Sequence, residues 1–168
     1  MSLPLLTQFR RAVRDSIDNW PALRGVFKRK WYFEDLGQLQ DPEPEPSIGE
    51  MPAINIGAGT VSTPWVTNQG QDLTGTIAIT VWTPHFYLPT LELIYQEIQR
   101  ALWQATPDDG NSRTYLARVT DNTIEQSAVQ VQAVLTESKA QAMRASWTIT
   151  VKLAWNPRLD DSILEITS

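Results

Sequence analysis

A change of hydrophobic period between residues 73 and 104 constrains the fold more than any other stretch of the chain. In its first part the side chains alternate, with Ile77, Ile79 and Val81 on one face, which is typical of a strand half-buried in a sheet. After a Thr–Pro break, apolar residues recur at spacings of three and four and line one face of a helix: Leu91, Ile94, Tyr95, Ile98, Ala101 and Leu102. The stretch therefore predicts a strand, a tight turn and a helix folded back over the sheet.

Composition indicates one soluble, globular domain. The chain has 168 residues, of which 42% are hydrophobic and 20% charged. It holds no Cys, which excludes disulfides and thiolate chemistry and fits a cytosolic origin. No apolar run reaches the ~20 residues that span a bilayer, and Gln8, Arg10, Arg11 and Arg14 interrupt any signal-peptide core. A net charge of −5 argues against a nucleic-acid-binding surface.

The N-terminal part predicts a helix and then a strand. An apolar stripe at helical spacing covers Leu3–Asn19, and Pro21 ends it. Gly25–Phe33 is rich in aromatic and β-forming residues and predicts a strand. Its basic cluster, Lys28, Arg29 and Lys30, has two interpretations: a solvated edge strand protected by lysine, or a contact for an acidic partner surface.

Two polar segments flank a short predicted strand at Met51–Ile56. Residues 38–50 alternate proline with acidic side chains, which predicts an extended loop and not a linker between domains. Residues 57–72 are polar, and we expect a second, irregular loop there. Trp65 in that loop either anchors it to its own domain or contacts a neighbour.

The C-terminal part predicts strands at Arg113–Thr120, Ile124–Glu137 and Ala142–Trp155. A turn at Glu137–Gln141 makes the last two an antiparallel hairpin. The last strand would run to roughly 45 Å, so it either bends or projects beyond its own domain, and a projecting hairpin needs a neighbour to pack on. Residues 158–168 form an expected C-terminal tail that is mobile or docked on another subunit.

The order of these elements predicts an α+β fold. We expect a mainly antiparallel sheet with two helices packed on one face and a long C-terminal β-hairpin, all within a single domain of residues 1–157. Two helices cover only one face. The other face carries Thr, Gln and Ser beside Trp82 and Ala78, so it is either wet or covered by another copy.

No catalytic, cofactor or metal constellation is present in the sequence. His85 is the single histidine and, without cysteine, builds no usual zinc site; no GxSxG accompanies it. The acidic pairs Asp108–Asp109 and Asp160–Asp161 lie in turn-like segments, and we interpret them as solvated loop charges. The glycines of Gly57–Gly59 lack the rest of a phosphate-binding motif. We therefore expect a protein that is not an enzyme, with no cofactor and no metal.

The run TIAITVWTPHFYLPTLELIYQEIQRALW resembles the tail terminator proteins of tailed bacteriophages, also called minor tail or tail completion proteins. The order of elements is similar to that of the family: an N-terminal helix, a strand ending at Val81–Trp82, a helix ending at Ile98, Ala101 and Leu102, and the closing strand WTITVKLAW. The resemblance in order covers most of the chain.

The resemblance implies a structural virion protein. It would form a hexameric ring at the tail–neck junction, after assembly in the host bacterial cytoplasm. The ring would cap the tail tube, bind the tail tube protein and a neck or connector protein, and let DNA pass through its pore without specific binding. No membrane is implied.

Two other functions stay open: another neck or head-completion connector subunit, and a small ligand-binding α+β domain in which Trp65, Trp82 and His85 line a pocket. For the assembly function, six residues are candidates for the interfaces: Lys28, Arg29, Lys30, Trp65, Arg144 and Trp155.

Overall fold

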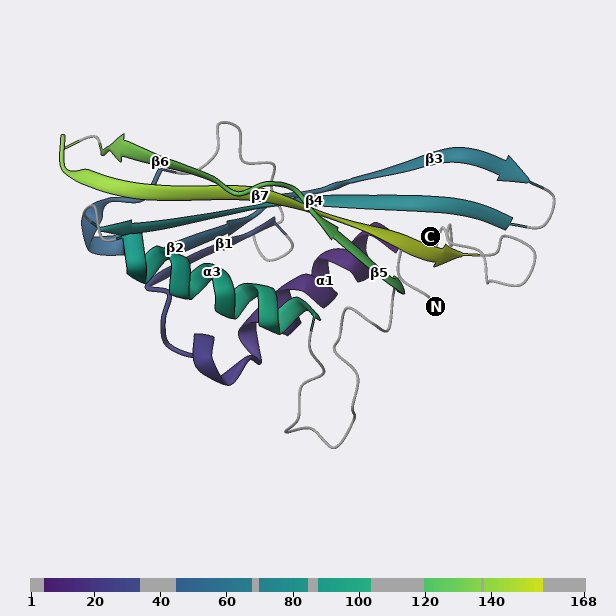
Figure 1. Cartoon of the computed structure of the whole chain (residues 1–168), viewed down its shortest axis with the longest axis horizontal. Coiled ribbons are helices and arrows are strands. Elements are labelled where there is room, and N and C mark those ends of the chain that lie inside the picture. The colour runs from purple at the N-terminus through teal and green to yellow at the C-terminus, as the bar shows by residue number, and fades with distance from the viewer. Residues whose placement is uncertain are drawn as a thin grey trace, which may run out of the picture.

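Two long antiparallel strands form the axis of the molecule (Figure 1). The structure is a computed structural model that describes residues 5–33, 45–67, 70–84, 88–103, 120–136 and 138–155. Strand β4 (Gly70–Pro84) pairs with β7 (Gln141–Trp155) along their whole length, from Gln71 opposite Trp155 to Pro84 opposite Ala142. Fifteen residues at ~3.3 Å each make a ribbon of roughly 50 Å.

The outer edge of β4 carries different strands along its two halves. Beside the second half lie β2 (Ala53–Ile56), antiparallel to β4, and then β1 (Arg29–Tyr32), parallel to β2. Beside the first half lies β3 (Thr60–Thr67), antiparallel to β4. Figure 1 shows this β3–β4 hairpin extending past the ends of both helices.

The outer edge of β7 is shared by β5 (Thr120–Gln126) and β6 (Gln130–Leu135). Gln126 lies opposite Ile149 and Gln130 opposite Ser146, so four steps on one strand face three on the other, which is the count of a β-bulge. At the bulge the Ser127 N–H donates to the Thr148 carbonyl at 3.0 Å, and the Thr148 N–H donates to Ser127 Oγ at 2.8 Å. The irregular backbone therefore keeps its hydrogen bonds.

Two α-helices in the described part of the chain cover one face of this sheet: α1 (Leu5–Asp18) and α3 (Leu88–Trp103). In α1 the spacing of the apolar residues places Phe9, Val13 and Ile17 against the sheet, where each is at most 1% exposed. The Trp20 indole N–H, just after α1, donates to Glu97 Oε2 of α3 at 2.8 Å. The main core combines both helices with the inner faces of the strands, including Ile54, Ile77, Ile79, Trp147 and Ile149.

A second, smaller apolar cluster lies on the opposite face of the sheet. It contains Trp31, Met51, Ala53, Trp82 and Ala142. The rings of Trp31 and Trp82 meet edge to face with centroids 6.1 Å apart. The segment before β2, with the 3₁₀ turn η2 (Ile48–Glu50), contributes Met51 and Ile48 to this cluster. Trp82 is therefore covered by its own chain, whereas Ala78 on the same face is exposed.

The structure confirms the predicted fold: an α+β arrangement with a mostly antiparallel sheet and a C-terminal hairpin. The predicted hairpin turn between β6 and β7 is present, with the Lys139 N–H donating to the Thr136 carbonyl at 2.8 Å. Both helices lie where the hydrophobic period predicts them, with α3 ending at Trp103.

Three boundaries predicted from the sequence are wrong. The expected polar loop at 57–72 contains β3 and the start of β4, which pair with each other through the backbone. The strand predicted at Gly25–Phe33 is limited to Arg29–Tyr32, after a 3₁₀ turn η1 (Pro21–Leu23). The single strand predicted at Ile124–Glu137 is divided by the bulge.

Other predicted segments lie outside the described residues. These are the first part of the acidic proline-rich loop, most of Arg113–Thr120, and the tail at 158–168.

Candidate interaction surfaces

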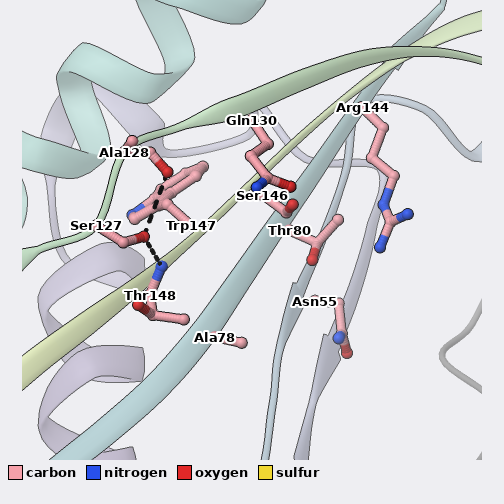
Figure 2. A pocket seen from close by; sticks show the side chains of 10 residues that line it. All are labelled: Asn55, Ala78, Thr80, Ser127, Ala128, Gln130, Arg144, Ser146, Trp147 and Thr148. Carbon is pink, nitrogen blue, oxygen red and sulfur yellow. Dashed lines mark hydrogen bonds between the residues drawn. The ribbon is translucent and has the colours of Figure 1, made fainter.

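The helix-free face of the sheet carries an open groove of about 590 Å³ (Figure 2). Its lining comes from β2, β4, β7 and the bulge: Asn55, Ala78, Thr80, Ser127, Ala128, Gln130, Arg144, Ser146, Trp147 and Thr148. Strand register explains the assembly of these side chains, because Asn55, Thr80, Ser146 and Gln130 are consecutive partners in one row across the sheet. The lining offers hydroxyl and amide groups and one cation, but no His, Asp or Glu.

Arg144 is the predicted interface residue that lies in this groove. It is half-buried on β7, directly opposite Trp82 of β4 on one side and Gln132 of β6 on the other. Figure 2 shows its side chain at the end of the groove, beyond Ser146 and Gln130. The groove is therefore a neutral hydrogen-bonding surface with a single positive charge.

The predicted basic cluster lies at the outer edge of the sheet, on and just before β1. Lys28, Arg29 and Lys30 are all exposed. The Arg29 guanidinium lies 5.4 Å from the Trp31 ring centroid, and its Nε lies 3.7 Å from Glu50 Oε2. The Lys30 ammonium lies 3.1 Å from Asp18 Oδ1. Exposed pairs of this kind contribute roughly 0–1 kcal/mol each, so they leave the cluster available to a partner.

The opposite edge of the sheet exposes apolar side chains of the strand predicted at Ile124–Glu137. Val131 is 44% exposed and Leu135 is 67% exposed, and both lie on β6. Val131 pairs with Ala145 and therefore faces the same side as the helices, but β6 lies beyond the area that the helices cover. The alternation of Val131, Ala133 and Leu135 with glutamines is the signal for an apolar strand face; it does not say which molecule covers that face.

The two remaining interface candidates lie at the far end of the ribbon. Trp65 on β3 is opposite Asp72, and Trp155 at the end of β7 is opposite Gln71, so the two residues flank neighbouring positions of β4. Their side chains lie outside what the structure describes. The six candidates thus fall into two groups, one near each end of the β4–β7 ribbon, and their role in an interface stays a prediction.

The residues considered for catalysis also lie outside the described chain. These are His85, Asp108–Asp109 and Asp160–Asp161. Within the described residues no group of three or more His, Asp or Glu side chains is placed to hold a metal ion. Over the same residues, neither helix has the length and apolar character to cross a membrane.

Comparison with known proteins gives a likeness in structure and none in sequence. No protein-family model matches the sequence, and no curated protein matches it. Among solved structures, the fold is similar to a chain from the virion of a native gene transfer agent particle, with a TM-score of 0.54 and 12% identity. The likeness covers 90% of this chain and 99% of that chain. At this identity it shows a shared fold.

Proposed function

We propose that this chain is a structural protein of a phage-type virion, and that it acts as the tail terminator. In this proposal six copies form a ring that caps the tail tube and joins it to the head-side neck. The observation that carries the proposal is the likeness, over nearly the whole of both chains, to a chain of a gene transfer agent virion.

The surfaces of the molecule support a role in assembly. On both sides the sheet ends in a strand whose outer edge pairs with no described strand. Unpaired strand edges are templates for association. A contact between two different edges is heterologous, and repetition of such a contact closes a ring when the rotation between copies is suitable. The same repetition brings the helix-free faces of all copies to the same side.

Charge is consistent with a pore for DNA. The net charge of −5 and the mostly neutral groove would let a polyanion slide past without the cationic contacts that hold it. Binding to the tube and the neck would then depend on shape and strand pairing, with no bond made or broken.

The experiment that tests this function is capture by isolated particle parts. Purified, gold-labelled protein is mixed separately with isolated tail tubes and with isolated heads of the corresponding virion, and labels are located by electron microscopy. We expect label at one end of each tube, none along its side, and an arrest of further tube-subunit addition.

Two results would contradict the terminator role. Label on heads but not on tubes would favour a neck or head-completion connector. A monomer that binds neither part, and whose Trp fluorescence is quenched by a small molecule, would favour a ligand-binding domain.

A further inference from the structure

One half of the sheet has a row of five strands with two different free edges. Trp31, Asn55, Thr80, Ser146 and Gln130 are successive partners across β1, β2, β4, β7 and β6. No described strand pairs with the outer side of β1 or of β6. At ~4.8 Å per strand these two edges lie roughly 19 Å apart, so they are separate surfaces of one molecule.

The two edges differ in charge. The segment from Arg24 to Phe33 holds four basic residues and no acidic one: Arg24, Lys28, Arg29 and Lys30. Strand β6 (Gln130–Leu135) holds no charged residue. Two β1 edges would bring like charges together, whereas a β1 edge beside the uncharged β6 edge does not.

Strand direction favours the same combination. Strand β1 is parallel to β2, β2 is antiparallel to β4, β4 to β7, and β7 to β6, so β1 and β6 of one molecule run in opposite directions. Copies related by a rotation axis that runs along the strands keep their strand directions. In such a ring β1 of one copy and β6 of the next would pair antiparallel.

We propose that copies join by antiparallel pairing of the β1 edge of one with the β6 edge of the next. This inference rests on the proposed assembly and names its interface. Side chains of β6 and β1 can be assigned to the same two faces of the sheet. Val131 and Leu135 lie on the helix side with Lys30 and Tyr32, while Gln130 and Gln132 lie on the helix-free side with Arg29. The exposed apolar face of β6 then packs against the aliphatic stem of the neighbour's exposed Lys30.

Engineered cysteines test this pairing directly, because the natural chain has none. Arg29→Cys is combined in one chain with Gln130→Cys, Gln132→Cys or Val134→Cys, all on the helix-free side, and the full-length protein is oxidised. A disulfide needs Cβ atoms about 4 Å apart, so the roughly 19 Å between the two edges excludes a bond within one chain. We expect at least one of the three pairs to give a ladder of linked copies up to the full ring.

The single-cysteine variants are the matched controls and should give no ladder and few dimers. Efficient dimers from Gln132→Cys alone would show two β6 edges meeting and would overturn the proposal. Rings that persist by native mass while none of the three pairs crosslinks would overturn the edge assignment and leave the proposed function standing. A protein that stays monomeric at all concentrations would overturn the proposed function itself.

A charge variant gives an independent readout. Gln132 is exposed on β6, and Gln132→Lys would place a cation beside the neighbour's Arg29 and Lys30. We expect the concentration at which the ring dissociates to rise roughly tenfold at low salt and to recover partly at high salt. Gln132→Glu is the control and should not weaken the ring. Equal effects of both substitutions would contradict the role of charge.

Discussion

Two glycines with left-handed backbone differ in what surrounds them. Gly25 has φ +73° with nothing within 4 Å of an added Cβ. Gly59 has φ +77°, and a Cβ there would meet Ile77 Cγ1 at 2.8 Å and the Thr76 carbonyl oxygen at 2.9 Å. Gly59 therefore holds the start of β3 close against β4, where only a hydrogen fits.

Gly59→Ala should accordingly destabilise the protein far more than Gly25→Ala. The left-handed backbone costs either alanine about 1–2 kcal/mol, and crowding at Gly59 adds about 1–3 kcal/mol. Urea unfolding of both variants measures the difference. Equal losses of unfolding free energy would show that β3 does not approach β4 as described.

A buried and an exposed apolar residue provide a second pair of substitutions. Ile79 is fully buried between β2 and β7, whereas Leu93 on α3 is 62% exposed. Ile79→Ala should lower the free energy of unfolding by about 2–5 kcal/mol, and Leu93→Ala should change it by at most about 0.5 kcal/mol. Thermal unfolding at a concentration below that of assembly checks this. A large loss at Leu93 in that monomer would contradict the exposed position.

At the residue scale, periodicity predicted burial well wherever the chain covers itself. Ile77, Ile79 and Val81 are at most 1% exposed, as their alternation predicts. The same pattern on β6 leaves Val131 and Leu135 exposed, because alternation says that a strand has an apolar face and not what lies over that face. Arg144 could not be placed in a groove from the sequence, since the groove depends on register across four strands.

At the scale of elements, long periodic segments were predictable and short or polar ones were not. Strand β4 from Leu73 onward, α3 and β7 hold a regular period over many consecutive residues, which is enough to identify them. Strand β3 has no such pattern, because it is held by backbone pairing to β4 with its exposed Thr60, Val61 and Ser62 facing solvent. The alternation of apolar and polar residues does not reveal the bulge between β5 and β6.

This arrangement predicts that β3 and the covered part of β4 differ in local stability. Amides of β4 between Ile77 and Val81 lie under the helices, whereas those of β3 lie in the hairpin beyond them (Figure 1). In the isolated chain, hydrogen exchange at β3 should be about a hundredfold faster or more than in that part of β4, because less buried surface opposes its opening. Mass spectrometry of peptides from both regions measures the ratio. Equal protection in a verified monomer would contradict a hairpin that lacks cover of its own.

For the whole molecule, the fold class followed from the order of elements, while the assembly did not. A strand–turn–helix followed by a long hairpin requires a sheet with helices on one face, which the structure has. Which edges stay free depends on the crossover that places β1 beside β2 and on the length of β6 beyond the helices. These non-local pairings are not encoded in any one segment.

We propose that this chain works as a closed ring of its own copies. Native mass spectrometry of the purified full-length protein, at concentrations where specific rings persist, tests it most directly. With a chain of 19.0 kDa, a ring of six copies should appear as a dominant species of about 114 kDa that loses subunits only on activation. A single species at 19.0 kDa across the whole concentration range would contradict it.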